Sequence, residues 1–260
     1  MNQDMPQPYR SQIIKASALI PDTRVLLLNW DFEQSIDANM QRAREDNLFA
    51  KASRSRVSDI LPIFRQRYFS EPNIGAMLAT VAEQPGHART LERLLYFYAA
   101  RADRLLHDTV TMFLAPRHAS GFDELLPVDL RLHIQEWVNE GRMTTHWGAS
   151  TVARVTQGLM ATLRDFGVLE GRIRKRIVSQ TLPIEAFVLI ATALAADGVR
   201  GDRLLVHPDW QLFFLDEPAV ERLFMEAHQR HLLEYHAAGS TRRITFPSTD
   251  LVEVARAITR

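Results

Sequence analysis

The clearest hydrophobic pattern in the chain lies at residues 149–166 and predicts an amphipathic helix. Its apolar residues recur at helical spacing and would form one buried stripe: Val152, Val155, Leu159, Leu163 and Phe166. Ser150 is a candidate N-cap, because its hydroxyl can accept a hydrogen bond from a free backbone N–H of the first turn. Gly167 is the expected end of the helix, since glycine enters the left-handed conformation without a Cβ clash.

The polar face of this helix and the residues after it carry positive charge. The face presents Arg154, Gln157, Ala161 and Arg164, and a short strand pair with a basic turn follows. A helix with an arginine-bearing face beside a basic hairpin is how winged-helix proteins meet DNA. An ordinary amphipathic helix with a solvated basic turn would give the same pattern, so both interpretations stay open.

The residues before about 115 show helical patterns only, which predicts an α-bundle over residues 1–118. Pro21, Pro72 and the pair Pro85–Gly86 separate the predicted helices. These helices are expected near 9–19, 31–46, 55–69, 73–84 and 89–114. Residues 115–121 are the candidate linker.

Residues 119–260 are predicted to form a second helical domain with short β-hairpins. Helices are expected at 128–140, 150–166, 184–196, 219–230 and 250–259, the last capped by Ser248 or Thr249. A second strand pair is expected at 231–236 and 241–246, so the domain would hold two helix-plus-wing units, each a helix followed by a hairpin. Residues 203–215 fit either a strand or a short helix beginning at Asp209. The predicted fold class is mainly α.

Composition limits the function classes that the chain can serve. The 31 basic and 31 acidic residues give zero formal net charge, so a nucleic-acid site must come from local segregation of charge. The absence of cysteine excludes disulfides, thiolate metal sites and cysteine nucleophiles, and suits a cytoplasmic protein. The N-terminal residues do not resemble a signal peptide. The most apolar segment, 183–196, is short and contains Glu185, so we expect a buried helix and no membrane anchor.

A first basic cluster lies in the N-terminal half, around the start of a predicted helix. Its candidate DNA contacts are Lys51, Ser53, Arg54, Arg56, Arg65 and Arg67. Helix N-termini favour anions through their free N–H groups and the helix dipole, so a serine cap beside arginines would make a phosphate contact. A solvated loop with surface arginines is the alternative.

A second basic cluster is the predicted hairpin turn, with Arg172, Arg174, Lys175 and Arg176 as candidate phosphate contacts. Base readout would fall to Arg154 and Gln157, with Ser150 and Thr151 holding the DNA backbone. If about five phosphates are neutralised, affinity should fall by about two to three orders of magnitude between 50 and 200 mM salt. Residues 141–150 leave little room for the middle helix of a standard helix-turn-helix, which favours backbone contact over groove insertion.

The sequence gives little support to an enzyme. His228, His231 and His236 crowd one segment with Glu234, but they lack the spacing of the helical zinc motif His-Glu-x-x-His. No residue two positions before a lysine is acidic or Gln, and neither a phosphate-binding loop nor a Gly-x-Ser-x-Gly turn is present. We expect no catalytic residues, no metal and no cofactor; a metal-dependent enzyme using His228 and His231 is the minor alternative.

Several motifs together resemble the BrxA family of the BREX phage-exclusion systems. They are Tyr9-Arg10, Asn47-Leu-x-x-Lys-x-Ser-x-Ser-Arg56, Ala149-Ser-Thr-x-x-Arg-Val with Phe-Gly-Val-Leu, and His207-Pro-Asp-Trp-Gln-Leu-Phe. The resemblance runs over nearly the whole chain. It implies a mainly helical protein whose N-terminal part is similar to the antitermination factor NusB. It also implies binding of double-stranded DNA and a role in phage defence beside a methyltransferase, an AAA+ ATPase and a phosphatase-like protein.

The expected function is therefore that of a non-enzymatic, cytoplasmic, DNA-binding component of a phage-defence complex. The main rival is a protein-interaction module, in which helical faces and basic patches dock onto acidic surfaces of the other defence proteins.

Overall fold

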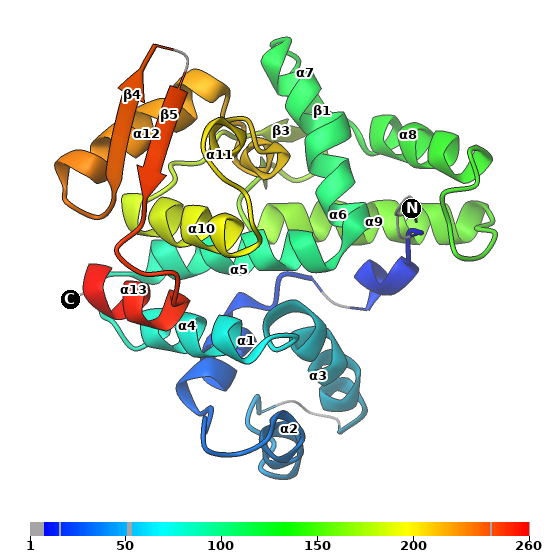
Figure 1. The fold of residues 1–260 in the computed structure, drawn as a ribbon. Coiled ribbons are helices and arrows are strands. Elements are labelled where there is room, and N and C mark those ends of the chain that lie inside the picture. Colours follow the sequence, from blue (N-terminus) through cyan, green and yellow to red (C-terminus); the bar gives the residue numbers. More distant parts are fainter. Residues whose placement is uncertain (1–7, 16, 51–53, 240, 260) are drawn as a thin grey trace, which may run out of the picture. The chain divides into compact units, whose positions relative to one another are not determined.

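A computed structural model describes residues 8–15, 17–50, 54–239 and 241–259, with the side chain of Arg54 left out. The chain groups into two compact units, each built from segments far apart in sequence (Figure 1). Unit 1 contains residues 1–19 and 99–180, and unit 2 contains residues 20–98 and 181–260. This grouping does not follow the boundary expected after residue 118, because each unit combines an early with a later stretch of the chain.

Unit 1 contains helices and one small sheet. Its elements are the 3₁₀ helix η1 (Ser11–Ile14), α6 (Arg104–Asp108), the π-helix η2 (Thr109–Leu114), α7 (Ala115–Ala119), β1 (Glu124–Leu125), α8 (Pro127–Asn139), α9 (Ala149–Asp165), β2 (Leu169–Glu170) and β3 (Lys175–Ile177). The predicted stripe of α9 is buried throughout, which confirms the helix and its inner face. Gly167 follows it with a φ of 77°, so the glycine stop is also confirmed.

Ser150 is not the N-cap of α9. Gly148 occupies that position and Ser150 is already the second helical residue, where its side chain is exposed. Glycine is an accepted N-cap residue because it adopts the non-helical backbone conformation at little cost.

The predicted hairpin is present and gains a third strand. β2 pairs antiparallel with β3, and β1, from before α8, pairs with the other edge of β3, giving the order β1-β3-β2. Each strand is only two or three residues long. The third strand therefore matters, because a lone two-stranded hairpin is marginally stable in water.

Unit 2 is a helical assembly with a second hairpin. Its elements are α1 (Ile20–Leu28), α2 (Ile36–Glu45), α3 (Arg54–Tyr68), α4 (Pro72–Ala82), α5 (Ala88–Ala102), α10 (Ile184–Ala196), α11 (Asp202–Leu205), the 3₁₀ helix η3 (Pro208–Phe213), α12 (Glu217–Gln229), β4 (Glu234–Ala238), β5 (Thr241–Thr245) and α13 (Leu251–Ile258). The boundary between the units falls inside α5, after Tyr98.

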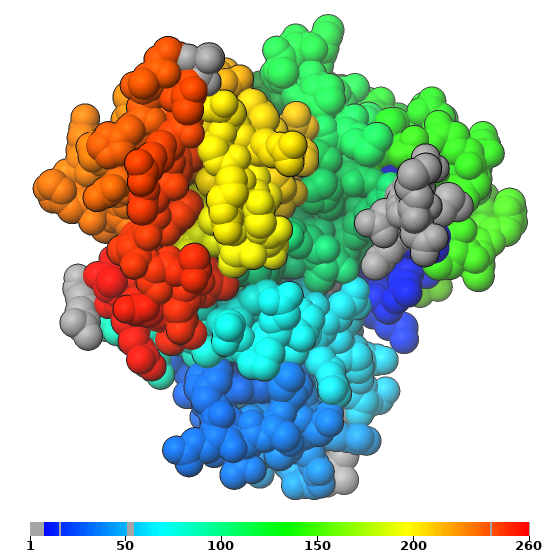
Figure 2. Space-filling model, viewed as in Figure 1, coloured from blue at the N-terminus to red at the C-terminus, as the bar shows by residue number. Residues whose placement is uncertain are grey.

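The most apolar helix, α10, is the centre of the C-terminal part of unit 2. Phe187 on α10 stacks on Trp210 at 5.0 Å and meets Phe224 of α12 edge-on at 4.8 Å. α13 packs against α10 and α4, and Figure 2 shows the red α13 against the cyan α4. The described helices include none long and apolar enough to cross a bilayer, and 183–196 forms the buried helix that the sequence predicts.

Four details differ from the sequence-based expectations. The helix expected over 89–114 breaks at Asp103, whose carboxylate accepts hydrogen bonds from the N–H groups of Leu105 and Leu106 and caps α6. The expected linker is the helix α7, and α1 was not predicted because Pro21 was taken as a helix separator, whereas it lies in the first turn. Asp250, not Ser248 or Thr249, caps α13. Of the two alternatives left open for residues 203–215, the structure shows the helical one, with α11 followed by η3. The mainly α fold class is confirmed.

Candidate nucleic-acid interface

The outer strip of α9 has the polar character that its sequence predicts. Arg154, Gln157 and Arg164 are exposed and Ala161 is half-buried, while the opposite face lies in the core. Arg154 has no ion pair or hydrogen bond with the described residues. Arg164 binds the neighbouring Asp165 at 2.7 Å, the last residue of the helix and its one acid.

Alternation along β3 decides which hairpin cations face solvent. Lys175 and Ile177 point inward, with Lys175 only 7% exposed, while Arg176 points outward. Lys175 donates from Nζ to the carbonyl of Gly171 at 2.5 Å. Burial, with a smaller contribution from the charge of Arg164, lowers the pKa of Lys175. Lys175 closes the turn from the inside, so only a small part of its side chain is accessible to a ligand.

The outward cations of the hairpin have acidic neighbours. Arg174 binds Glu124 of β1 at 2.9 Å, with both side chains more than half exposed. Arg176 lies between Glu124 and Glu170 in the sheet register but forms no ion pair with the described residues. Arg172, in the turn, likewise has none. Exposed pairs of this kind contribute about 0–1 kcal/mol, so a phosphate can replace the carboxylate at Arg174.

A groove of about 790 Å³ lies between α9, the first turn of α8 and the hairpin. Its apolar lining includes Leu126, Val128 and Met160. Its charged lining residues are all cationic: Arg131, Arg164, Arg172 and Lys175. No acidic side chain lines it within the described part of the chain, so positive charge is locally segregated here.

The N-terminal segment packs along α9 beside the exposed strip. A Cβ built on Gly158 would lie 2.9 Å from the carbonyl oxygen of Ile13, so the glycine permits the close approach of η1 to α9. Further along, Tyr9 pairs with the connection between α8 and α9, donating its N–H to the carbonyl of Arg142 at 2.8 Å. The segment therefore ties down both α9 and the connection that leads into it.

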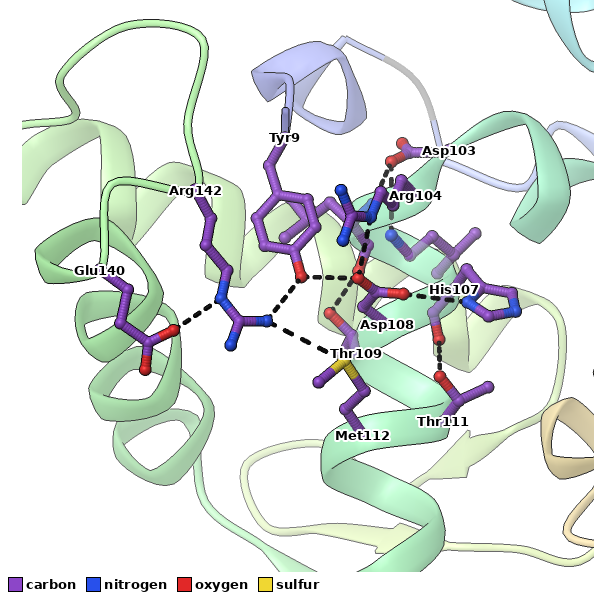
Figure 3. A network of polar contacts seen from close by, with 12 residues as sticks. Tyr9, Asp103, Arg104, His107, Asp108, Thr109, Thr111, Met112, Glu140 and Arg142 are labelled. Atoms are coloured by element: carbon purple, nitrogen blue, oxygen red, sulfur yellow. Dashed lines mark hydrogen bonds and ion pairs between the residues drawn. The ribbon is translucent and has the colours of Figure 1, made fainter. Parts of the chain in front are cut away.

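Figure 3 shows the polar network that anchors Tyr9. The Tyr9 hydroxyl donates to Oδ2 of Asp108 at 2.7 Å, and Arg104 and His107 contact the same carboxylate at 3.2 and 3.0 Å. Arg142 reaches the Tyr9 hydroxyl at 3.5 Å and Glu140 at 2.6 Å. Three parts of unit 1 meet here: the N-terminal segment, α6 and the connection after α8.

Burial and hydrogen bonding set the pKa values in this network. Burial alone raises the pKa of Asp108, but hydrogen bonds from His107 and Tyr9 and the charge of Arg104 outweigh it, so the pKa lies below its ordinary value. Burial, together with the bond to Asp108, raises the pKa of Tyr9 to about 12. At neutral pH the network therefore holds a carboxylate and a neutral phenol, which matches the observed direction of donation.

The first basic cluster lies in unit 2 and is only partly available. Lys51 and Ser53 lie outside the described residues, and Arg54 begins α3. Arg56 is exposed in the first turn of α3, and Arg65 binds Asp37 of α2 at 2.5 Å. Arg67 is 5% exposed, so its guanidinium belongs to the interior and not to a DNA-binding surface.

The described histidines and acids do not gather into a metal site: no group of three or more is placed to hold an ion. His228 and His236 lie with their rings 5.4 Å apart, and the Nδ1 of His228 accepts the N–H of Tyr235 at 3.4 Å. The arrangement gives the metal-dependent alternative no support.

Two residues in or beside the groove did not enter the sequence prediction. Arg131 lines the groove from α8, and Ile173 lies at the tip of the hairpin with 82% of its surface exposed. The signal for Ile173 was present, since an isolated apolar residue stands between two arginines. Nothing in the sequence brings Arg131 to α9, because that contact depends on packing.

Comparisons with known proteins give one family and one fold. Two crystal structures of SspB, one with bound magnesium, resemble the chain with a TM-score of 0.58 and 14% identity. They cover 96% and 98% of this chain and 87% and 88% of their own. At this identity the likeness concerns the fold alone. No curated protein matches. The sequence profile of the BrxA family matches residues 7–193, and the chain belongs to the BrxA family.

Proposed function

We propose that this protein is a non-enzymatic, cytoplasmic component of a BREX phage-defence system that binds double-stranded DNA through unit 1. Membership of the BrxA family supports the place in a BREX system. The same membership suggests a methyltransferase, an AAA+ ATPase and a phosphatase-like protein as partners. The DNA-binding part of the proposal rests on the geometry of α8, α9 and the hairpin.

The order of elements in unit 1 supports a winged-helix module. Helices α6 and α7 precede β1, helices α8 and α9 follow, and β2 and β3 close the sheet with β3 in the centre. In such a module α9 would be the recognition helix and the hairpin would be the wing. The limited room between Gly141 and Ser150 is then no obstacle, because α8 itself is the helix that precedes the recognition helix.

The single observation that carries the proposal is the groove whose charged lining residues are all cationic, in a chain with zero net charge. Arg131, Arg154 and Arg172 carry no ion pair with the described residues, so they are the first candidates for phosphate contact. Gln157 lines the same groove from α9, and Arg and Gln can each bind a base edge with two hydrogen bonds. Ser150 and Thr151 lie in the first turn of α9, where free N–H groups favour phosphate.

The remaining candidates contribute less. Arg174 and Arg176 have glutamate neighbours, and Arg164 is paired with Asp165, so each must exchange a carboxylate for a phosphate. Lys175 and Arg67 are buried, so we do not include them among the proposed DNA contacts. Lys51, Ser53, Arg54 and Arg56 remain a second, separate phosphate contact in unit 2, with Arg65 held by Asp37.

The test is the binding of a fluorescent duplex at two salt concentrations. Two or three phosphate contacts should weaken binding by about 10- to 40-fold between 50 and 200 mM salt. This is less than five contacts would give, because several of the predicted cations are buried or paired. The double variant Arg154→Ala/Arg172→Ala should lose both affinity and most of the salt dependence.

A matched control is Arg243→Ala/Arg256→Ala, which removes the same charge from exposed positions of unit 2. It should bind like the unchanged protein. An affinity that does not change with salt, or equal losses of affinity in both double variants, would contradict a DNA-binding site in unit 1.

A protein-interaction module is the second candidate, favoured by one observation. Val128 and Leu132, one turn apart on α8, are 39% and 60% exposed. Leu132→Asp would abolish co-elution with a purified BREX partner if this face docks a protein, and would leave DNA binding unchanged.

A further inference from the structure

The tip of the β2–β3 hairpin presents an apolar side chain in a cationic setting. Ile173 is 82% exposed, more than any other large apolar residue of the described chain. Its neighbours in sequence are Arg172 and Arg174, both exposed. Single exposed apolar residues are common on protein surfaces, so exposure alone has no meaning. The exposure of Ile173 becomes informative because of how the turn is built.

The turn holds Ile173 outward by a fixed backbone. Gly171 has a φ of 95°, and a Cβ on it would lie within 2.4 Å of the carbonyl oxygen of Arg174. Lys175 donates to the carbonyl of Gly171 from the inner side, and the hairpin is bound to β1 along its other edge. The glycine, the buried lysine and the third strand leave the tip little freedom, so the exposure of Ile173 is built into the hairpin.

We propose that Ile173 is a wedge that enters the minor groove of bound DNA and unstacks a base step, so that this protein bends the duplex. Apolar wedges in minor-groove proteins, isoleucine among them, kink DNA by about 20° to 90°. Arg172 and Arg174 would hold the phosphates on either side of the wedge, which offsets the cost of unstacking. The inference rests on the proposed DNA binding by unit 1 and adds deformation of the DNA to it.

This arrangement fits DNA better than a protein partner. A protein-docking tip would be expected to carry its apolar residue within a wider apolar surface, because interface cores are depleted in charge. Here both sequence neighbours of the single isoleucine are arginines, and all the charged residues that line the adjacent groove are cationic. Phosphates flanking an opened base step supply charges that match this pattern.

The test uses a short duplex with dyes at its two ends and 2-aminopurine beside a central TA step, which is a flexible step. Saturating protein should bring the dyes closer and raise the 2-aminopurine fluorescence. Ile173→Ala should lose most of both signals at saturation while affinity for the duplex falls by less than about fivefold, since the lost apolar contact and the avoided unstacking oppose each other. Ile173→Leu should retain both signals.

Two controls separate the inference from the proposed function. Leu132→Ala removes an exposed apolar side chain elsewhere in unit 1 and should bend DNA normally. Arg172→Ala should weaken affinity while saturated complexes remain bent. A straight duplex in the saturated complex, or an unchanged bend with Ile173→Ala, would overturn the wedge and leave DNA binding intact. Failure of the unchanged protein to bind the duplex would overturn both.

Discussion

Two segments of equal length, residues 149–177 and 217–245, have the same order of helix, strand, turn and strand, but the first is net positive and the second is neutral. The first carries six cations and two acids, and its helix has one acid, at the last position. The second carries four cations and four acids. In the second, Arg242 lies 3.5 Å from Glu221 of the helix, which also accepts a 2.5 Å hydrogen bond from Tyr235.

The comparison shows that a helix followed by a hairpin does not by itself leave its cations free of acidic partners. In the 217–245 segment the helix supplies the carboxylate that holds the hairpin arginine, so the charges cancel internally. In the 149–177 segment the helix offers its hairpin no such acid, and the glutamates that approach Arg174 and Arg176 come from strands. Charge therefore remains available along α9, around the groove and at the tip, which is where a polyanion can be bound.

Charge reversal should give the largest effect and tests the comparison directly. Arg154→Glu/Arg172→Glu should lower affinity for duplex DNA by about 100-fold or more at low salt, because each change replaces an attraction by a repulsion. The matched Arg243→Glu/Arg256→Glu should change affinity by less than about threefold, because these residues lie outside the site. Anisotropy titrations measure both. Equal losses would mean that net charge, and not the groove, governs binding.

The two turns should differ in their tolerance of a side chain. Gly171→Ala should lower the free energy of unfolding by about 2–4 kcal/mol, because positive φ and contact with a backbone carbonyl both oppose a Cβ. Gly239 has a φ of 60° but open space around it, so Gly239→Ala should cost only about 1 kcal/mol. Urea unfolding measures the pair. Similar costs would show that the β2–β3 turn is not the tighter one.

Each unit also has a tyrosine that donates to a carboxylate, Tyr9 to Asp108 in unit 1 and Tyr235 to Glu221 in unit 2. Loss of these two hydrogen bonds should lower the free energy of unfolding by different amounts. Tyr9→Phe should cost about 2 kcal/mol, since it leaves Asp108 buried with one partner fewer. Tyr235→Phe should cost less than about 1 kcal/mol, because Glu221 is partly solvated. Thermal or urea unfolding distinguishes them.

The same network predicts a dependence on acid. Because the folded-state pKa of Asp108 is lowered, its contribution to stability is present at neutral pH and is lost as the pH falls below about 4. Asp108→Asn should remove that part of the acid dependence. An identical loss of stability between pH 5 and pH 2 in both proteins would contradict this assignment.

The smallest expected effect concerns the ion pair between Arg174 of the hairpin and Glu124. Glu124→Gln frees Arg174 and should raise DNA affinity by about two- to fivefold, the range that a solvated pair implies. Glu221→Gln, which frees Arg242 in the other segment, should leave affinity unchanged. A gain in both variants would place DNA on the 217–245 hairpin as well.

Most of the helices and both hairpins were predictable from the sequence, and each wrong prediction has an identifiable cause. The break at Asp103 was hidden because apolar residues continue at helical spacing on both sides of it. The inward position of Lys175 could have been predicted, because residues 175 and 177 of a strand point to the same face and Ile177 is apolar. Instead, a cation was assumed to face solvent. The availability of Arg65 was not predictable, because its partner Asp37 lies on another helix.

Local sequence determined the inner stripe of α9, its glycine stop and the cationic turn that follows, because helix periodicity and backbone freedom act over a few residues. Tertiary structure alone decided that Arg131 reaches the groove, that β1 completes the sheet and that Tyr9 is held by Asp108, 99 residues away. The reason is physical: a cationic side chain is available to a ligand only when folding places no carboxylate against it. The positions of those carboxylates depend on contacts between distant segments.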